Sequence, residues 1–262
     1  MTYTLEQLES MMVKARLLGT MKCIPTKCGH HIYFIIDISE GVNLLYIPDD
    51  VEYIVERETD YDSTRSQYCN IECKTLTVIG GNNLKSTNCM FRDCRAQSLD
   101  LSTFDTSKVT NMEYMFENCQ AQYIDMSSFN TSNVTNMTGM FDYCLAQSLD
   151  LSNFDTSKVT DMYQMFQYCE AQSLDLRSFD TSSVTNMAFM FQGCIAELLD
   201  LSSFNTSKVT DMREMFRACE AQSLDLRNFD ASKVTDMHEM FRACEAVIKA
   251  TDPKILEEIN KR

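Results

Sequence analysis

The sequence predicts an α/β solenoid, a right-handed, curved stack of 25-residue coils that each contain a strand, a turn and a helix. The first observation is a 25-residue unit that repeats six times through residues 95–246 without insertion or deletion. The second is that apolar residues recur at this interval, with cysteine at Cys94, Cys119, Cys144, Cys169, Cys194, Cys219 and Cys244. A fixed period in the twenties is typical of stacked repeats, because each unit buries its apolar side only against its neighbours.

Residues 1–70 are predicted to form an α+β cap ahead of the stack. Thr4 and the apolar residues that follow it at helical spacing indicate a capped amphipathic helix that ends at Gly19. Two runs rich in β-branched and aromatic residues, 32–37 and 43–47, predict a hairpin. An atypical unit is expected here, because a terminal coil has one face without a neighbour.

The solenoid is predicted to span residues 71–246, because the period begins in a degenerate form before its first clear copy. Phe91 and Cys94 match the repeat, and Leu76 lies 25 residues before Leu101. Residues 247–262 are predicted to form a C-terminal capping helix with Pro253 in its first turn. Its apolar residues are expected to cover the last coil: Ile255, Leu256 and Ile259.

Each repeat is interpreted as a strand followed by a short helix. In residues 96–120, Leu99 and Leu101 fit a leucine-rich template and point to one side of a strand. The helix is indicated by apolar residues at i, i+3, i+4 and i+7 spacing: Val109, Met112, Met115, Phe116 and Cys119. Helices pack ~8–10 Å apart and strands ~4.8 Å apart, so such a stack must curve with its strands concave. The cysteines, on the helical side, are then too far apart for disulfides and form a reduced, buried column.

The unit L-D-L-S-x-F-[DN]-T-S-K-V-T-[DN]-M-x-x-M-F-x-x-C resembles the BspA-like bacterial surface-protein repeats, a branch of the leucine-rich repeats. The resemblance covers residues 71–246, and it implies a leucine-rich-type solenoid that binds other proteins. Many members of that family are secreted or lipid-anchored. The opening stretch MTYTLEQLES has neither a basic region nor an apolar core typical of a leader, so we expect a cytoplasmic protein of bacterial or phage origin.

Composition excludes several partners. The net charge is −15, which argues against direct binding to nucleic acid, because that requires cationic groups facing phosphates. No apolar run approaches ~18 residues, so no membrane partner is expected. Twelve cysteines without an export leader indicate a reducing compartment.

No cofactor or metal is expected, and neither is an enzyme. His30, His31 and His238 lie outside any evident triad, and there is no Gly-rich phosphate loop. Zinc is an open alternative for the N-terminal thiols and imidazoles, although their spacing fits none of the usual finger patterns. The residues concerned are Cys23, Cys28, His30, His31, Cys69 and Cys73.

The first candidate binding surface is the predicted concave strand face. It carries one aspartate per coil: Asp100, Asp125, Asp150, Asp175, Asp200 and Asp225. Such a column suits a basic partner or imitates a phosphate backbone; alternatively, each Asp serves hydrogen bonding within its own repeat. The face varies only at Tyr123, Arg177, Leu198 and Arg227, and exposed aromatic residues are enriched in binding sites.

The second candidate surface is the outward, convex face of the predicted helices. Aromatic residues gather there in the middle coils: Tyr114, Tyr143, Tyr163, Tyr168 and Phe189. A contiguous apolar patch indicates a partner protein or a contact between two copies of the chain, as in a homodimer. Partial burial against neighbouring helices is the alternative.

The favoured function is an intracellular protein–protein interaction solenoid that binds a partner protein through one of these two faces. The alternative is a mobile-element-encoded inhibitor, whose acidic column mimics nucleic acid and blocks a nucleic-acid-binding defence protein. The partner is therefore expected to be a protein, and in the second case a basic one.

Overall fold

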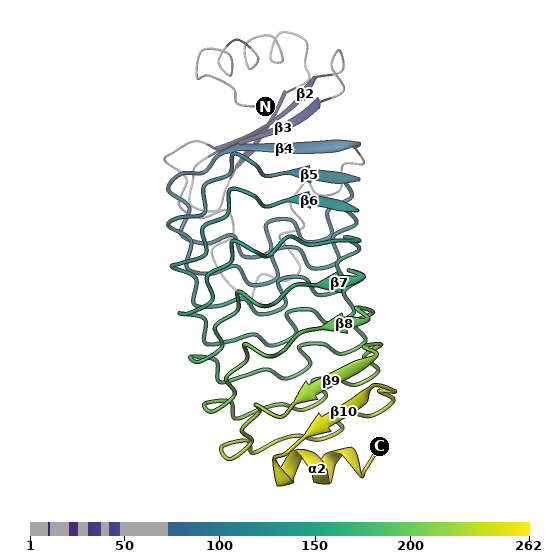
Figure 1. Cartoon of the computed structure of the whole chain (residues 1–262). Coiled ribbons are helices and arrows are strands. Elements are labelled where there is room, and N and C mark those ends of the chain that lie inside the picture. Colours follow the sequence, from purple (N-terminus) through teal and green to yellow (C-terminus); the bar gives the residue numbers. More distant parts are fainter. Residues whose placement is uncertain (1–9, 11–20, 26–30, 38–41, 48–72) are drawn as a thin grey trace.

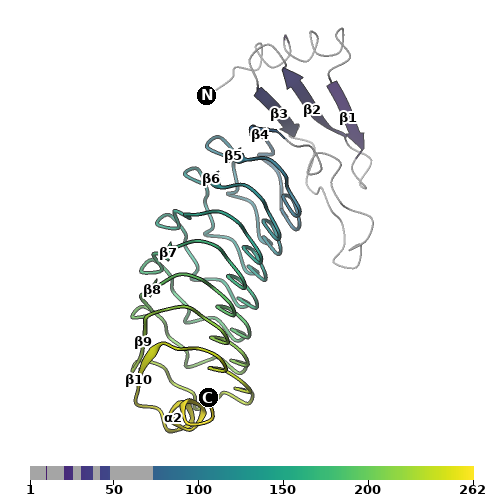
Figure 2. The same ribbon diagram turned by 90° about the vertical axis from the view of Figure 1, so that its right-hand side faces the viewer.

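The computed structural model describes residues 10, 21–25, 31–37, 42–47 and 73–262. Residues 73–250 form a parallel β-solenoid of about seven turns, whose coils stack on one another (Figures 1 and 2). The predicted solenoid is therefore confirmed. The α/β class and the helix in every coil are wrong, because residues 73–250 contain only short strands, bridges and turns.

Three strands precede the solenoid at its N-terminal end. β1 (Met21–Pro25) pairs antiparallel with β2 (His31–Asp37), which pairs antiparallel with β3 (Val42–Ile47). β2 and β3 are the expected hairpin. β3 then pairs in parallel with β4 (Thr75–Gly80), so that one six-stranded sheet runs from β1 to β6. The helix expected to end at Gly19 lies almost wholly outside the described residues.

The strands of the solenoid are short and lie in two parallel sheets. The first sheet continues from β4 through β5 (Ser98–Asp100) to β6 (Tyr123–Asp125), and the second holds β7 (Ser173–Leu174), β8 (Leu198–Leu199), β9 (Ser223–Leu226) and β10 (Val247–Ala250). Leu76 pairs with Leu99 rather than with Leu101. The first coil is thus two residues shorter at this point than the exact period predicts.

The predicted helix is replaced by a turn segment, residues 112–119 and their equivalents. The N–H groups of four alternate residues donate to carbonyl oxygens of the next coil at 2.8–3.0 Å: Met112, Tyr114, Phe116 and Asn118. Those of Met115, Glu117 and Cys119 donate three residues back within the coil. An α-helix needs bonds four residues back and negative φ throughout, whereas Tyr114 and Asn118 both have φ of +51°.

The turn segments also overturn the predicted spacing of the coils. Parallel bridges such as Asn111–Asn136 link neighbouring coils on this side, as strand pairing does on the other. Both sides therefore use the ~4.8 Å separation of a β-ladder, and helices do not widen one side into a convex surface. The cysteine column follows the same spacing, so its thiols are neighbours: Cys94 and Cys119 are within hydrogen-bonding contact.

The core consists of columns of identical side chains. Seven phenylalanine rings stack from Phe91 to Phe241, with centroids 5.4–5.9 Å apart and planes within 10° of parallel. Methionine, valine and cysteine columns beside them are almost completely buried. Offset aromatic pairs add roughly 0.5–1.5 kcal/mol each beyond burial of their area. The predicted packing residues of the repeat are therefore confirmed as core.

Three corners of each coil are held by an aspartate or asparagine. The carboxylates of Asp100 and Asp105 and the amide oxygen of Asn111 each accept from the N–H two residues further on, at 3.2, 2.8 and 2.9 Å. Such side chains turn the chain by bonding nearby backbone. The repeated Asp and Asn positions thus belong to the folding of each coil.

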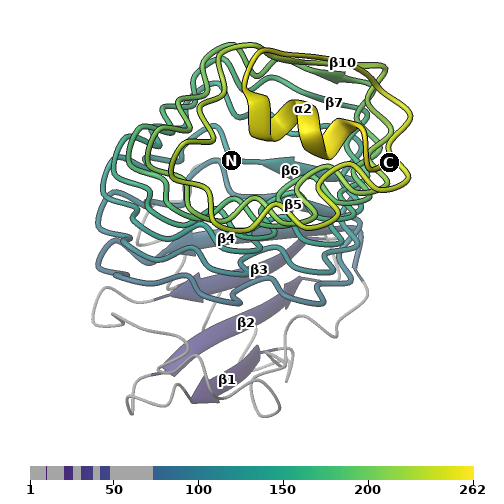
Figure 3. The same ribbon diagram turned by 90° about the horizontal axis from the view of Figure 1, so that it is seen from below.

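The C-terminal end is closed by α2 (Pro253–Ile259), which lies across the last coil (Figure 3). Asp252 caps the helix by accepting from Lys254 and Ile255, and its second oxygen accepts from Ala231 at 3.0 Å. Ile255 is fully buried, whereas Leu256, expected to cover the last coil, is exposed.

Candidate protein interface

The outward side chains of the strands and of the residues just after them form the strand face. It carries the predicted aspartate column, with Asp100 and Asp125 in direct register. Each aspartate accepts from residue i+2 of its own coil, as Asp150 does from the Ser152 N–H and hydroxyl at 3.1 and 2.6 Å. Hydrogen bonds from Ser152 and Ser202 lower the pKa of Asp150 and Asp200, so these carboxylates stay ionised.

Two arginines interrupt the acidic column and pair within their own coils. Arg177 lies 2.5 Å from Asp175, and Arg227 lies 2.5 Å from Asp225. The arginine hydrogen bonds lower the pKa of both aspartates to about 2. All four side chains are largely exposed, so these pairs mainly reduce the negative charge of the face.

Tyr123 and Leu198 are exposed on the strand face but do not form one site. Both occupy the same place in their coils, since Tyr123 pairs with Ser98 and Leu198 pairs with Ser173. Two coils that carry serine at this place lie between them. The structure therefore leaves each as an isolated apolar side chain.

The outward side chains of the turn segments form the turn face, and there the predicted aromatic residues do meet. The rings of Tyr143 and Tyr168 stack with centroids 4.7 Å apart. They remain 48% and 38% exposed, and among the described residues they are the two exposed aromatic rings that stack on each other. Tyr168 continues over Gly193, which has no side chain to block it.

A second aromatic group, Tyr114, Tyr163 and Phe189, lies on the turn face four or five residues before the place in the repeat that Tyr143 and Tyr168 occupy. Tyr163 packs edge-on against Phe189 at 5.5 Å, and the guanidinium of Arg213 lies 5.6 Å from the Phe189 ring centroid. Tyr114 lies over Gly139, and its hydroxyl is 3.4 Å from an amide oxygen of Gln164. Tyr114, Tyr163 and Phe189 are half-buried, so partial burial holds for this group.

A polar column, which the sequence did not lead us to expect, lies between the places of the two aromatic groups in the repeat. It comprises Arg92, Glu117, Asp142, Gln167, Gln192, Arg217 and Arg242. Arg92 pairs with one Glu117 oxygen at 3.0 Å, while the second Glu117 oxygen and one Asp142 oxygen are buried without a hydrogen bond. Burial raises the pKa of Asp142 to about 7, and the charge of Glu117 adds to the rise. The first x of M-F-x-x-C is polar in every coil, which was the available sign.

The described residues contain no group of three or more side chains suited to hold a metal ion. The zinc alternative falls on Cys23, Cys28, His30, His31 and Cys69, whose side chains lie outside the described part of the chain; Cys73 is half-buried there. The nine described cysteines, from Cys73 to Cys244, form no disulfide. Of the described helices, none has the length and apolar character to cross a membrane.

The fold and these faces define a repeat solenoid with two regular, chemically distinct sides. Residues 85–196 and 145–253 match the family described as "Mycoplasma protein of unknown function, DUF285". Together the matches cover well over half of the chain, so the chain belongs to this family. They support the resemblance to BspA-like repeats at the coarse level of a repeat family. No curated protein and no solved structure matches the chain.

Proposed function

We propose that the chain is a protein–protein interaction solenoid that binds its partner through the turn face of the middle coils. The observation that carries this proposal is the Tyr143–Tyr168 pair, whose rings stack at 4.7 Å and yet stay exposed. Rings already held against each other lose little conformational entropy on binding. Tyrosine also offers a large apolar area with a polar tip, the combination enriched at interfaces.

The strand face supports this role less well. Its aspartates hydrogen-bond within their own coils, as Asp100 and Asp150 do, and this accounts for their presence in every repeat. A binding site on a repeat protein depends on residues that differ between coils. On the strand face these differing residues are single, separated side chains. The proposed location is a reducing, cytoplasmic compartment, and the buried thiols of the cysteine column, which form no disulfide, support it.

One observation favours the alternative, an inhibitor that mimics nucleic acid. Asp150 and Asp200 are exposed, and the lowered pKa of each keeps the column charged at neutral pH. A basic protein would then be the partner, and binding would weaken steeply as salt rises.

A capture experiment separates the two. The immobilised chain is incubated with extract of the native host, beside a Tyr143→Ala, Tyr168→Ala variant and an Asp150→Asn, Asp175→Asn, Asp200→Asn variant. The turn-face proposal expects the tyrosine variant to lose the captured protein and the asparagine variant to keep it. Loss with the asparagine variant alone, together with release by salt, would sink the turn-face proposal and favour mimicry. Unfolding curves of both variants control for folding.

A further inference from the structure

The hydrogen bonds between turn segments all run in one direction along the solenoid. In the last complete step, the N–H groups of Glu214 and Phe216 donate to the carbonyl oxygens of His238 and Met240, both at 2.9 Å. Each accepting carbonyl belongs to the peptide unit that would donate in the following step. Six successive steps repeat this pattern with four bonds each. The peptide dipoles, each about 3.5 D, are therefore aligned, with their positive N–H ends toward the C-terminus.

The last turn segment ends this series with a row of open donors. Among the described residues, no acceptor is bonded to the backbone N–H of Met237, Glu239, Phe241 or Ala243. Phe241 is only 1% exposed, so water has little access to its N–H. A buried donor without a partner costs about 1–3 kcal/mol, which native proteins seldom tolerate without a ligand or water. The row therefore offers four backbone N–H donors to the acceptors of a ligand.

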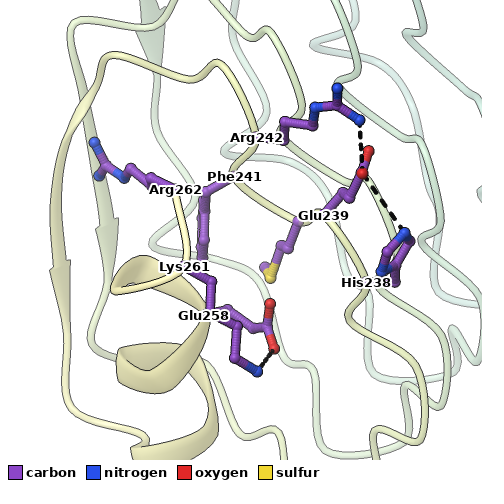
Figure 4. A pocket seen from close by; sticks show the side chains of 8 residues that line it. His238, Glu239, Phe241, Arg242, Glu258, Lys261 and Arg262 are labelled. Carbon is purple, nitrogen blue, oxygen red and sulfur yellow. Dashed lines mark hydrogen bonds and ion pairs between the residues drawn. The ribbon is translucent and has the colours of Figure 1, made fainter.

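A cavity of about 420 Å³ lies beside this row, between residues 238–242 and the end of α2 (Figure 4). Glu258, Lys261 and Arg262 line its helix side. Its volume falls in the usual range for ligand sites, ~300–1,000 Å³.

The residues that line the cavity carry a net positive charge, with Arg242, Lys261 and Arg262 against Glu239 and Glu258, although the chain carries −15. Glu239 pairs with Arg242 at 2.6 Å, and Lys261 pairs both with Glu258 at 2.7 Å and with Glu257, outside the lining, at 3.0 Å. Arg262 donates to the carbonyl oxygens of Cys244 and Ala246 at 3.2 and 3.1 Å. It has no carboxylate partner in the part of the chain that the structure describes, so its charge is in surplus.

We propose that this end of the solenoid binds an extended, acidic peptide segment of a partner protein. The alternate carbonyl oxygens of the segment would accept from the open N–H row, and its carboxylates would face Lys261 and Arg262. A peptide fits better than a small oxyanion, because the open donors recur at every second residue. In each of the preceding coils, the equivalent donors are bonded to alternate backbone carbonyl oxygens of the next coil. Adding a segment to an open backbone edge is a common mode of peptide recognition. The site is separate from the turn-face aromatic residues and stands without them.

The test is a titration of the full, ¹⁵N-labelled chain with an acetylated, amidated Glu-Val-Glu-Val-Glu peptide. We expect saturable downfield shifts of the Glu239 and Phe241 amide protons as these groups acquire acceptors. Lys261→Glu should weaken binding by about tenfold or more, the equivalent of roughly 1.4 kcal/mol. Lys249→Glu is the matched control, because it makes the same charge change on β10 at the same end, and it should change binding less than about twofold. Lys261→Ala serves instead if the reversed charge unfolds α2.

Several results would overturn the proposal. One is the absence of amide shifts up to millimolar peptide. Equal shifts with sodium acetate at the same carboxylate concentration would show a small-anion site, and equal binding of Lys-Val-Lys-Val-Lys would remove the role of charge. A concentration-dependent dimer in sedimentation, with its contact at Glu239 and Phe241, would make a second copy the occupant instead of a partner.

Discussion

The ring of Tyr168 lies against Gly193 in the next coil, where a Cβ atom on the glycine would come within 2.4 Å of two ring carbons. Both residues occupy the same place in their turn segments and both have positive φ. Ala218 and Ala243 occupy this place in later coils, also with positive φ. The backbone conformation therefore accepts an alanine, and the tyrosine ring is what requires glycine at position 193.

Gly193→Ala should lower the free energy of unfolding by about 2 kcal/mol, within the range for overpacking. The same change made in a Tyr168→Ala background should cost less than about 1 kcal/mol, because the ring is gone. Urea unfolding of the two single variants and the double variant measures this coupling. Equal costs in both backgrounds would show that φ, rather than the ring, sets the requirement.

The buried threonine column joins coils through its hydroxyl groups. The Thr156 hydroxyl donates to the Asp180 carbonyl at 3.0 Å and accepts from the Asp180 N–H at 2.9 Å. Thr156→Val keeps the shape and removes both bonds, so we expect a loss of about 2 kcal/mol from two partly buried backbone groups left unpaired. Thr156→Ser, which keeps the hydroxyl, should cost about 1 kcal/mol. A valine variant as stable as the serine variant in urea unfolding would refute the role of these bonds.

The sequence predicted the core columns and the stacking correctly because both depend only on the period. Phe116 and Phe141 lie 25 residues apart, and the structure stacks them. The same period placed Tyr143 beside Tyr168, so the exposed part of the turn face was predictable. The contacts within one coil were not predictable, because the period does not say which x of M-F-x-x-C turns inward. The buried position of Asp142 was therefore missed.

The helix prediction failed because the spacing of Val109, Met112, Met115, Phe116 and Cys119 fits a helix and a pair of tight turns equally well. The difference lies in φ at Tyr114 and Asn118, and tyrosine is a residue type that gives little warning of positive φ. Gly139 and Gly193 were the available warning, since glycine replaces tyrosine at these two places. The wide spacing of the cysteines had been inferred from the helix, so that inference was wrong as well.

Asp142 should make stability depend on pH. Its pKa in the folded chain is about 7, raised from an ordinary value of 3.8 by burial and by the nearby charge of Glu117. The stability that its protonated form provides is fully present below about pH 4 and is lost as the pH rises through 7. Asp142→Asn should therefore stabilise the chain at pH 8, by about 2 kcal/mol, and should have no effect near pH 4.

Asp150→Asn is the matched control for this pH dependence, because its shift has the opposite sign. Hydrogen bonds from Ser152 lower the pKa of Asp150, so its carboxylate stabilises the chain at neutral pH and loses this effect in acid. Thermal melts of both variants and the wild type from pH 2 to pH 8 measure the two trends. A stability difference for Asp142→Asn that stays constant across this range would refute the raised pKa.

The cysteine column should be unreactive in the folded chain. Burial raises the pKa of Cys144 to about 12 and that of Cys194 to about 11, and the thiolate is the reactive form. We expect iodoacetamide at pH 8 to leave both thiols unlabelled in the native chain and to label both fully in urea, with the sites mapped by mass spectrometry. Half-buried Cys73 is the internal control and should label in the native chain. If Cys144 were labelled as fast as Cys73, the middle coils would have to open readily, which would contradict a buried and unreactive column.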